Sequence, residues 1–206
     1  MAKTTYIAVA GNVGCGKSTL VDFVCRNYKV EPFFEPNAQN PYLANFYADM
    51  KKWAFHSQIY FLTHKFRIHQ ELEQERRKRT VVQDRTIFED AEVFAAMLRR
   101  RRLINKRDWG VYQDLYKSIV SSLASPDLMI YLAASVRTIR RRIKIRGRPE
   151  EQAIPVSYIR GLNRLYEEWF GGYKRSPTIT IDTDNLDYIT DLVDRIGVLK
   201  TIEKYL

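Results

Sequence analysis

A glycine-rich string near the start of the chain combines residue types that can hold phosphate. Residues 11–18 read Gly-Asn-Val-Gly-Cys-Gly-Lys-Ser, so three glycines lead into a lysine and a hydroxyl side chain. Glycine lets the main chain turn tightly and direct its N–H groups inward, which is how such loops hold phosphate groups. In this arrangement Lys17 reaches the terminal phosphates of a nucleotide, and the hydroxyl of Ser18 binds Mg²⁺.

The residues on both sides of this string match what a phosphate-binding loop requires, a strand before it and a helix after it. The apolar run Tyr6–Ala10 predicts the strand, and residues 19–24 have the apolar spacing of a helix, whose positive dipole end then faces the loop. We therefore predict nucleotide binding rather than a chance glycine-rich turn. The predicted loop residues are Gly11, Asn12, Val13, Gly14, Cys15, Gly16, Lys17, Ser18 and Thr19. Cys15 is interpreted as a residue small enough for its place rather than as a reactive thiol.

The composition places the chain among globular proteins. It has 206 residues, 45% of them hydrophobic, and no low-complexity tract, which suits one α/β domain over residues 1–206. It lacks an apolar run near the roughly 20 residues of a membrane span, and the first residues lack the apolar core of a signal peptide. The two cysteines, Cys15 and Cys25, form no C-x-x-C pair, as is usual in a reducing compartment. We therefore expect a cytoplasmic protein with no membrane partner.

The net charge of +10 makes nucleic-acid binding an alternative that must be weighed. The basic residues gather at 76–79, 99–102 and 137–148. The first two groups lie near the ends of predicted helices, where exposed charge is common, and aromatic residues do not alternate with them to stack on bases. We therefore expect no nucleic-acid partner. The third group is considered below with the residues around it.

Short apolar segments alternate with helical patterns along the whole chain. The predicted strands are Tyr6–Ala10, Val30–Phe34, Thr80–Gln83, Leu128–Ala133 and Thr178–Ile181. The predicted helices lie near residues 17–28, 43–77, 87–104, 109–124, 136–146, 156–171 and 187–204. Continuous apolar strands that alternate with helices predict a parallel, doubly wound α/β sheet. An apolar stripe along the second helix, from Trp53 to Leu72, is interpreted as core packing.

Three of the predicted strands end in a carboxylate. Glu35 follows the second strand, Asp84 the third and Asp182 the fifth. Ligands of open parallel sheets bind beyond the carboxyl ends of the strands, so these side chains are expected on the same edge as the phosphate-binding loop. One such residue alone is usually a helix cap or a turn residue. Glu35 directly before a proline and Asp84 directly before Arg85 make a chemical role the better interpretation for these two.

Several longer segments carry a likeness to a known family. They are Gly11–Ser18, Phe34–Pro36, Asn40–Leu43, Phe55–Leu62, Asp84–Asp90 and Arg142–Gln152, and the likeness covers nearly the whole chain. The Phe-x-x-Gln-Ile-Tyr and Asp-Arg-Thr-x-x-Glu-Asp patterns are much more specific than the phosphate-binding loop. With these segments the chain resembles the deoxynucleoside kinase family, in particular the bacterial deoxyadenosine/deoxyguanosine kinases.

The resemblance implies a P-loop kinase fold, with a five-stranded parallel sheet flanked by helices and an arginine-rich lid. It implies a homodimer that transfers the γ-phosphate of ATP, with Mg²⁺, to the 5′-hydroxyl of a deoxynucleoside in nucleotide salvage. Glu35 then takes the proton of this hydroxyl, because a sugar hydroxyl is a poor nucleophile. Asp84 holds Mg²⁺ together with Ser18. Arg85 and Lys17 neutralise charge on the transferred phosphoryl group, and Arg85 also holds Glu35.

The third basic group matches the lid of this family, at about residues 142–153. Arg142, Arg146 and Arg148 would close over ATP and spread positive charge around the transition state. The alternative is one exposed face of a basic helix. Gly147, with a proline two residues later, favours a mobile loop over a helix that continues.

The remaining matched residues are expected to bind the deoxynucleoside. Tyr47 and Glu151 match the pair that binds the 3′-hydroxyl, although by its residue type alone Tyr47 is equally an ordinary half-buried tyrosine. Gln58 and Asp90 are expected to bind the base, because an amide can pair with adenine and a carboxylate accepts from an amino group. Relatives commonly place arginine seven residues after this glutamine, where this chain has Lys65, a donor without the planar fork of arginine. The substrate-binding set is therefore Glu35, Tyr47, Gln58, Arg85, Asp90 and Glu151.

Two other functions stay open from the sequence. A thymidylate kinase or another nucleoside monophosphate kinase shares the loop, an Asp-Arg element and an arginine lid, but its anionic acceptor needs cationic residues, and Asn37–Asn40 supplies none. A nucleic-acid-binding NTPase or a non-catalytic binding module is the second, suggested by an isoelectric point near 9.6. We expect a deoxynucleoside kinase that prefers deoxyadenosine, deoxyguanosine or both, with thymidine as the poorest substrate.

Overall fold

A five-stranded parallel sheet forms the centre of the protein in the computed structural model, which describes residues 4–34 and 40–205. The strands are β1 (Tyr6–Ala10), β2 (Glu31–Phe33), β3 (Val81–Asp84), β4 (Leu128–Ala133) and β5 (Thr178–Asp182). Their order in the sheet is β2-β3-β1-β4-β5, and every neighbouring pair is parallel. The predicted sheet is confirmed, with each strand end within one residue of its expected place.

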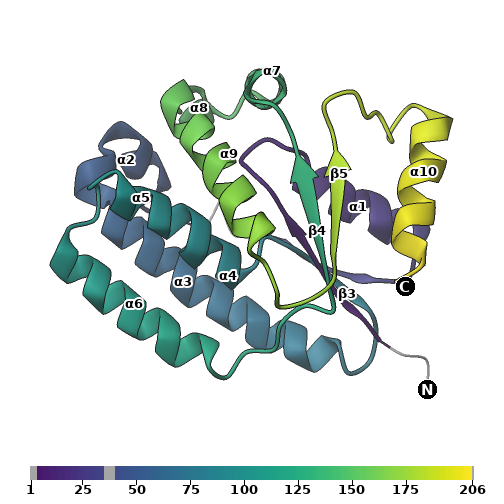
Figure 1. The fold of residues 1–206 in the computed structure, drawn as a ribbon, viewed down its shortest axis with the longest axis horizontal. Helices are drawn as coiled ribbons and strands as arrows, with labels where there is room; N and C mark the ends of the chain where they lie inside the picture. Colours follow the sequence, from purple (N-terminus) through teal and green to yellow (C-terminus); the bar gives the residue numbers. More distant parts are fainter. Residues whose placement is uncertain (1–3, 35–39, 206) are drawn as a thin grey trace.

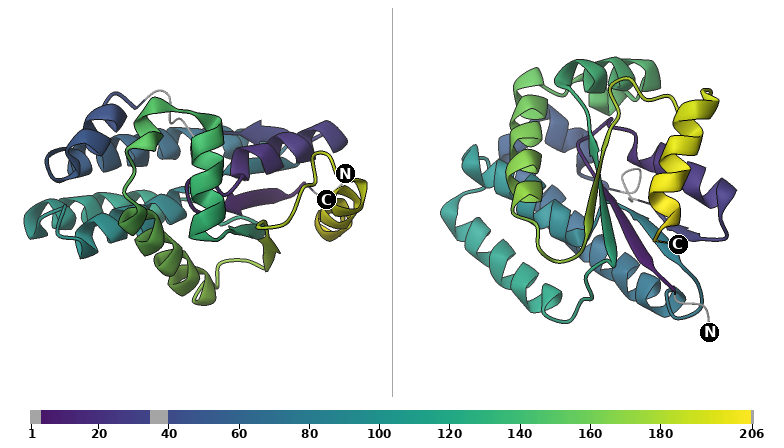
Figure 2. Two further views of the ribbon diagram at one scale, coloured as in Figure 1. Left: turned by 90° about the horizontal axis from the view of Figure 1, so that it is seen from above. Right: turned by 45° about the vertical axis from the view of Figure 1, so that its right-hand side comes forward.

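Helices cover both faces of this sheet (Figures 1 and 2). They are α1 (Lys17–Asn27), α2 (Leu43–Ala48), α3 (Met50–Glu75), α4 (Ile87–Glu89), η2 (Asp90–Ala95), α5 (Ala96–Arg100), α6 (Lys106–Val120), α7 (Val136–Arg146), α8 (Pro149–Gln152), α9 (Val156–Gly171) and α10 (Leu192–Glu203). In Figure 1, α1 and α10 lie on one side of the sheet, and α3, α6 and α9 lie on the other. Among the described helices, none is long and apolar enough to cross a membrane.

The two faces of the central strands pack against different helices, because successive side chains of a strand point to opposite sides. Val9 of β1 packs in a cluster with Leu20 of α1 and Ile202 of α10. Its neighbour Ala8 packs in another cluster, with Leu72 of α3. Burial on both faces explains why the central strands have continuous apolar sequences.

The long helix predicted for residues 43–77 is two helices, α2 and α3. The carboxylate of Asp49 accepts a hydrogen bond from the main-chain N–H of Lys52 at 3.1 Å and caps the second helix. An aspartate at this position satisfies a main-chain donor that the first helical turn leaves without a partner. The apolar periodicity continues across this break, and for that reason the pattern predicted a single helix.

The segment predicted as a helix over 87–104 ends at Arg100 and contains a π-helical turn, η2. The main-chain N–H of Ala96 bonds to the carbonyl of Ala91, five residues earlier, which is the spacing of a π turn. The helix stops where the chain turns at Arg102, whose φ is +59°. Such turns occur mostly as single insertions in α-helices, frequently at functional sites.

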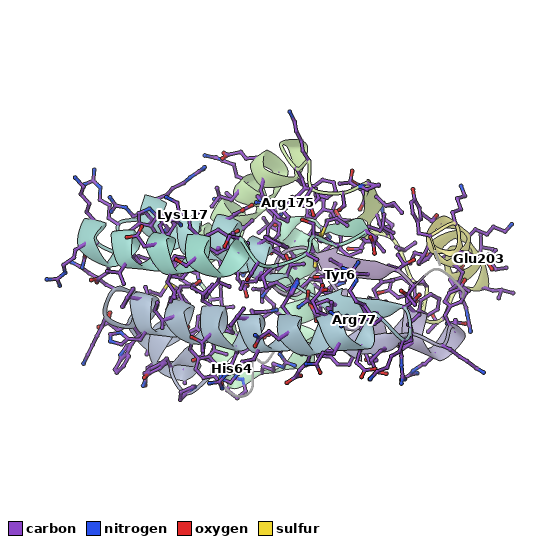
Figure 3. The ribbon with its side chains drawn as sticks, turned by 90° about the horizontal axis from the view of Figure 1, so that it is seen from below. Tyr6, His64, Arg77, Lys117, Arg175 and Glu203 are labelled. Atoms are coloured by element: carbon purple, nitrogen blue, oxygen red, sulfur yellow. The ribbon has the colours of Figure 1, made fainter. Side chains whose placement is uncertain are left out.

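Two other helices begin at capping residues that the apolar pattern did not reveal. α6 starts after Asn105, whose side chain accepts from the N–H of Asp108, rather than at residue 109. α10 starts after Asp191, which caps it, rather than near residue 187. α3 and α6 lie side by side along one edge of the molecule (Figure 3).

Candidate active site

The phosphate-binding loop, residues 11–18, lies where the strand order of the sheet reverses. β1 has β3 on one side and β4 on the other, and the chain leaves β1 toward β2 but later crosses from β3 to β4. Parallel sheets bind ligands in the crevice at such a point, beyond the carboxyl ends of the strands. The phosphate-binding loop follows β1, and Asp84 is the last residue of β3, so both face this crevice.

The conformation of the phosphate-binding loop depends on its glycines. Gly11, Gly14 and Gly16 have φ angles of +147°, +77° and +108°. A Cβ atom on Gly11 would lie 2.8 Å from the carbonyl oxygen of Leu132, so a side chain does not fit there. Cys15 is 1% exposed, and burial raises the pKa of its thiol, which agrees with its interpretation as a small packing residue.

The ammonium group of Lys17 lies inside the curve of the phosphate-binding loop. It donates to the main-chain oxygens of Gly11 and Asn12 at 3.0 and 3.2 Å. The residue is 6% exposed and lines the cavity described below. The cation is therefore held at the point where the N–H groups of the loop and the first turn of α1 converge.

The two predicted metal ligands are in contact. Ser18 Oγ donates to Asp84 Oδ2 at 2.5 Å, and Asp84 Oδ1 is buried with no hydrogen-bond partner among the described residues. A hydroxyl and a carboxylate oxygen are donors that Mg²⁺ accepts, and this ion usually takes only one or two protein ligands beside substrate phosphates. The residues therefore fit Mg²⁺. In the part of the chain that the structure describes, no larger cluster of His, Cys, Asp and Glu could hold a metal ion.

Arg85 follows Asp84 in a left-handed backbone conformation, with a φ of +60°. A non-glycine residue in this region costs about 1–3 kcal/mol, and such strain gathers at functional sites. Its guanidinium donates to the carbonyl of Gly11 at 3.2 Å and lies 4.2 Å from the ring centre of Phe94. Arg85 is 5% exposed, so this cation stands in a nearly dry part of the crevice.

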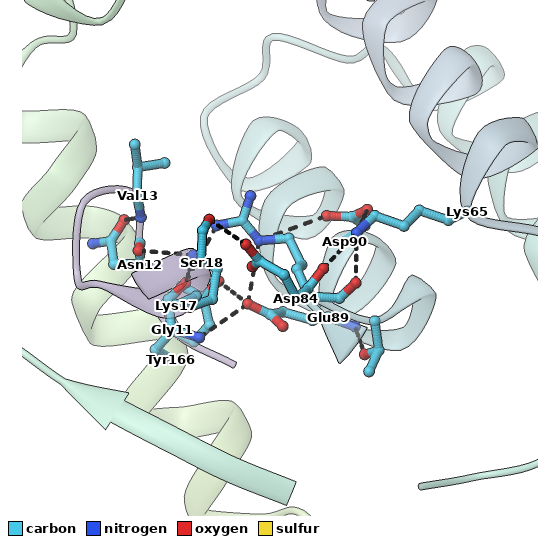
Figure 4. Close-up of polar contacts among 12 residues, drawn as sticks. Gly11, Asn12, Val13, Lys17, Ser18, Lys65, Asp84, Glu89, Asp90 and Tyr166 are labelled. Carbon is cyan, nitrogen blue, oxygen red and sulfur yellow. Dashed lines mark hydrogen bonds and ion pairs between the residues drawn. The ribbon is translucent and has the colours of Figure 1, made fainter. Parts of the chain in front are cut away.

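Glu89 lies beside these residues, and the sequence analysis quoted it but gave it no role. It is fully buried, and its Oε1 accepts from the N–H of Gly11 at 3.1 Å and from Arg85 Nε at 3.3 Å. The hydroxyl of Tyr166 donates to the same oxygen. Figure 4 shows Glu89 between the phosphate-binding loop and the segment that carries Asp84 and Asp90. Burial raises the pKa of Glu89, while the nearby Arg85 and Lys17 act in the opposite direction.

Lys65 is buried below the segment that carries Asp84 and Arg85. Its Nζ donates to the main-chain oxygens of these two residues, at 3.2 Å and 2.5 Å, and lies 3.9 Å from Asp90 Oδ2. Lys65 is 1% exposed. This lysine therefore supports the strained main chain of Arg85 and balances the charge of Asp90 from the interior of the protein (Figure 4).

A cavity of about 450 Å³ joins the phosphate-binding loop to the predicted base-binding residues. The lining residues that the sequence analysis predicted for the site are Val13, Gly14, Gly16, Lys17, Ser18, Thr19, Tyr47, Gln58, Asp84, Arg85, Asp90, Arg146, Arg148 and Glu151. The lining residues that the sequence analysis missed are Asp22, Phe34, Leu43, Phe46, Phe61, Phe94 and Tyr158. A cavity with aromatic walls and a few buried polar groups suits a nucleobase, which is a flat ring with polar edges.

The missed aromatic residues carried a signal in their spacing. Phe61 lies one helical turn after Gln58, and Phe94 lies one turn after Asp90, so each faces the same side of its helix as the polar residue. Glu89 carried no comparable signal, because its partner Tyr166 is distant in the sequence.

The predicted lid residues divide between two places. Arg146 and Arg148 both pair with Glu151 at the mouth of the cavity, the second pair at 3.3 Å. The segment after Gly147, expected as a loop, forms the short helix α8, because Pro149 is well suited to a first helical turn. The described structure therefore brings Glu151 to the cavity together with the arginines.

Arg142 lies on the other side of the phosphate-binding loop. It donates to the carbonyl of Cys15 at 2.8 Å and to the hydroxyl and carbonyl of Thr183 at 2.9 and 2.6 Å. Together with Tyr188 and Arg146 it lines a second cavity, of about 330 Å³, beside the loop. The remaining predicted loop residues, Gly11, Asn12 and Cys15, are buried and do not line the first cavity, whereas Cys15 lines the second.

The other two carboxylates that follow predicted strands are Glu35 and Asp182. Glu35 lies outside the described residues, so its position stays a prediction. Asp182 is exposed at the end of β5, and its carboxylate accepts the N–H of Asp184 at 2.9 Å. Asp182 is therefore a turn residue, which is the ordinary role of an isolated carboxylate after a strand.

Comparison with known proteins decides the family. A family profile described as deoxynucleoside kinase matches residues 7–206. The chain belongs to the deoxynucleoside kinase family. It is 34% identical to the deoxyadenosine/deoxycytidine kinase of Bacillus subtilis (strain 168), with 95% of this chain and 93% of that protein covered. It is 36% identical to a deoxyguanosine kinase of Lactobacillus acidophilus, with 96% and 89% covered.

A solved structure agrees with these relatives. Deoxyadenosine kinase from M. mycoides with bound dATP matches with a TM-score of 0.81 at 32% identity, over 97% of this chain and 99% of that one. The protein is therefore a deoxynucleoside kinase, a phosphotransferase that uses a nucleotide as its phosphate donor. The alternatives of a nucleoside monophosphate kinase and of a nucleic-acid-binding NTPase give way to this assignment.

Proposed function

We propose that this deoxynucleoside kinase transfers the γ-phosphate of ATP, with Mg²⁺, to the 5′-hydroxyl of deoxynucleosides whose base carries an exocyclic amino group. Deoxyadenosine and deoxyguanosine are the preferred acceptors, and the work is done by one cytoplasmic domain over residues 1–206. The observation that carries the proposal is the shared cavity, which has Lys17, Ser18 and Asp84 at one end and Gln58 and Asp90 at the other.

The phosphate-binding loop and the second cavity hold the donor in this proposal. The N–H groups of the loop and the ammonium of Lys17 bind its phosphates, and Ser18 and Asp84 hold Mg²⁺, which supplies charge neutralisation when bound. The second cavity beside the loop is large enough for a base and opens between Arg142 and Tyr188. The guanidinium and the ring offer planar surfaces to the adenine of ATP.

The acceptor lies across the crevice from the donor. Glu35 takes the proton of the 5′-hydroxyl, and Arg85 stabilises the charge that gathers on the transferred group. Tyr47 and Glu151 bind the 3′-hydroxyl, and both line the cavity. Since Glu151 already pairs with Arg146 and Arg148, a bound sugar and the lid arginines share one carboxylate. Residues 142–153 act as the lid over the donor phosphates.

Base selection rests on hydrogen-bond direction. Asp90 is buried beside the cations Lys65 and Arg85. A carboxylate paired with cations accepts hydrogen bonds and donates none. Adenine, guanine and cytosine each offer an exocyclic amino group to such an acceptor, whereas the exocyclic groups of thymine are two carbonyl oxygens and a methyl group. The names of the relatives, which include deoxyadenosine, deoxyguanosine and deoxycytidine kinases, agree with this rule.

A homodimer is part of the proposal, and the outer face of α6 is the proposed contact. Val111 and Leu115 lie one helical turn apart on α6 and are 55% and 38% exposed. α3 packs beside this helix and carries the half-buried Phe55 and Ile59. A second copy that packs α3 and α6 against their counterparts would cover this apolar strip in an isologous interface.

The test is kcat/KM for the four natural deoxynucleosides with labelled ATP, repeated with Asp90→Ala. Thymidine should be poorer than the best purine by about 10²-fold or more, because a buried charge would face an acceptor atom. Asp90→Ala should narrow this gap. Thymidine within threefold of the best purine, or an unchanged ranking in the variant, would contradict the proposed base selection.

Two further arms of this experiment test the other functions considered from the sequence. Deoxynucleoside monophosphates in place of deoxynucleosides test a monophosphate kinase, and single-stranded DNA without an acceptor tests a stimulated NTPase. Neither should support turnover above the rate with ATP alone.

A further inference from the structure

We propose that Glu89 and Tyr166 are positioning residues for phosphoryl transfer, which fix Arg85 against the phosphate-binding loop and connect both to α9. The inference rests on the proposed role of Arg85 in the reaction. Neither side chain lines the cavity, so both act through the residues that do.

A single oxygen of Glu89 receives three donors from three parts of the chain. They are the N–H of Gly11 at the start of the phosphate-binding loop, Nε of Arg85 and the hydroxyl of Tyr166 on α9. The side chain of Glu89 is fully buried, and an ionised carboxylate is the group best suited to accept several donors at one oxygen. Nη2 of Arg85 donates to the carbonyl of Gly11, and Arg85 lines the cavity.

Glu89 itself is held in place by its own element. It is the last residue of α4, whose cap is Thr86, and its N–H donates to the hydroxyl of Thr86 at 3.1 Å. The carboxylate therefore projects from a short capped turn that begins directly after Arg85. Since Arg85 has a strained backbone, a fixed partner for its side chain restricts the directions in which the guanidinium can point.

One face of α9 carries the connection to the phosphate-binding loop. Asn12 Nδ2 donates to the carbonyl of Ile159 at 3.0 Å and to Asn163 Oδ1 at 2.5 Å. Ile159, Asn163 and Tyr166 are spaced by four and three residues, so they lie on the same side of the helix. α9 follows α8, which carries Glu151, so a rigid helix joins the lid segment to the loop and to Glu89.

The same helical segment provides a matched control, Glu92. Its carboxylate accepts from Tyr116 at 2.7 Å, from Trp169 at 2.7 Å and from Arg175 at 2.9 and 2.6 Å. Glu92 thus also binds a tyrosine and an arginine, but it lines neither cavity, and these bonds reach neither Arg85 nor the phosphate-binding loop. A substitution of Glu92 therefore tests the loss of a structural contact without a change in the contacts of Arg85.

The experiment compares Glu89→Gln, Glu89→Asp, Tyr166→Phe, the Glu89→Gln/Tyr166→Phe double variant and Glu92→Gln. For each, kcat, both KM values and the melting temperature are measured, and rates are expressed per folded molecule. Glu89→Gln should lower kcat by about 10- to 100-fold, with less than about a threefold change in KM for the deoxynucleoside. Glu89→Asp, which keeps the charge, should recover part of the loss. Tyr166→Phe should lower kcat by about 3- to 10-fold and add little in the double variant.

Glu92→Gln should lower the melting temperature and leave kcat per folded molecule unchanged. The proposal is overturned if Glu89→Gln behaves in the same way, or if Tyr166→Phe and Glu89→Gln are fully additive. Arg85→Ala, measured in parallel, tests the proposed role of Arg85 separately from the proposed role of Glu89 and Tyr166. A normal kcat in that variant removes the role of Arg85, whereas a low kcat in Arg85→Ala beside a normal kcat in Glu89→Gln removes only the positioning pair. Since each rate is compared with that of the unmodified enzyme on its best acceptor, the result does not depend on which base is preferred.

Discussion

The two ends of the crevice, which we propose to bind the donor and the acceptor, are built in opposite ways. Most of the donor end is one continuous string, residues 11–18, in which three glycines have positive φ angles, and Asp84 joins it from the end of β3. The acceptor end takes its side chains from α2, α3, η2, α8 and α9, which are distant in the sequence. The donor end therefore depends on backbone conformation, whereas the acceptor end depends on which side chains meet and on how their charges are balanced.

The charge balance differs in the same way. At the donor end, the bonds of Lys17 to described residues go to carbonyl oxygens, so these bonds leave its positive charge available to phosphate. At the acceptor end the charges come in buried groups, Lys65 beside Asp90 and Arg85 beside Glu89. Breaking such a group is costly for stability, because one charge is left inside the protein. The two ends should therefore respond differently to substitution, the donor end in rate and the acceptor end in rate and stability together.

The largest effect is expected at the donor end. Lys17→Ala should abolish phosphoryl transfer, a loss of at least about 10³-fold, because electrostatic stabilisation supplies most of what this reaction needs. The melting temperature should stay near its original value, since among the described residues the side chain bonds to just two carbonyls of the loop. Removal of Mg²⁺ with EDTA should have the same effect on the rate. Appreciable turnover by the folded variant or by the metal-free enzyme would contradict the proposed donor site.

The next effect concerns the carboxylate expected to act on the acceptor hydroxyl. Glu35→Gln should lower kcat by about 10²-fold or more and leave most deoxynucleoside binding intact, because general-base assistance is worth about 10²–10⁴ in rate. Steady-state kinetics with a binding measurement separates the two quantities. A kcat close to that of the unmodified enzyme would show that Glu35 is not the general base of the reaction.

The two ends of the crevice also differ in how much of their structure could be predicted from the sequence alone. The phosphate-binding loop and Asp84 were predictable, because a contiguous motif and a strand end define their positions. Lys65 was recognised only as a departure from the usual arginine, and its bonds to two carbonyls depend on how α3 packs against the end of β3. Glu89 was missed for the same reason, since Tyr166 reaches it from α9, and a pattern within one segment cannot show such contacts.

The fold shows the same division. The strands were predicted within one residue, because burial on both faces leaves a continuous apolar run. The helix boundary at Asp49 and the π turn of η2 were not, because a capping hydrogen bond and a one-residue insertion leave the apolar periodicity nearly unchanged. Arg142 and Arg146 are four residues apart on α7, yet Arg146 pairs with Glu151 whereas Arg142 bonds to Cys15 and Thr183.

The buried charges of the acceptor end give the third prediction. Lys65→Met removes the ammonium from beside Asp90 and the donor from two buried carbonyls. The free energy of unfolding should fall by about 3–5 kcal/mol, as for other buried pairs that lose one partner. Lys52→Met on the same helix is the control, because Lys52 is exposed and its contact with Trp53 is a surface cation–π pair worth about 0.5–1 kcal/mol. Equal losses in the two variants, measured by urea unfolding, would contradict the comparison.

The smallest effect is a dependence of stability on pH that originates below the acceptor end. His69 of α3 is fully buried between the rings of Tyr6 and Phe88, and Phe88 directly precedes Glu89. Burial lowers the pKa of His69, Glu73 opposes this shift from 3.5 Å, and Arg76 adds to it. The folded protein therefore keeps this imidazole neutral at a pH where the unfolded chain, with a pKa of about 6.5, already binds a proton. The contribution of His69 to stability is thus complete above the unfolded pKa and is lost as the pH falls toward the folded pKa.

The variant His69→Leu cannot bind this proton. The melting temperature of the unmodified protein should therefore fall relative to that of the variant between pH 8 and pH 5. If the difference in melting temperature between the two proteins is the same at pH 8 and pH 5, His69 is not kept neutral in the folded protein.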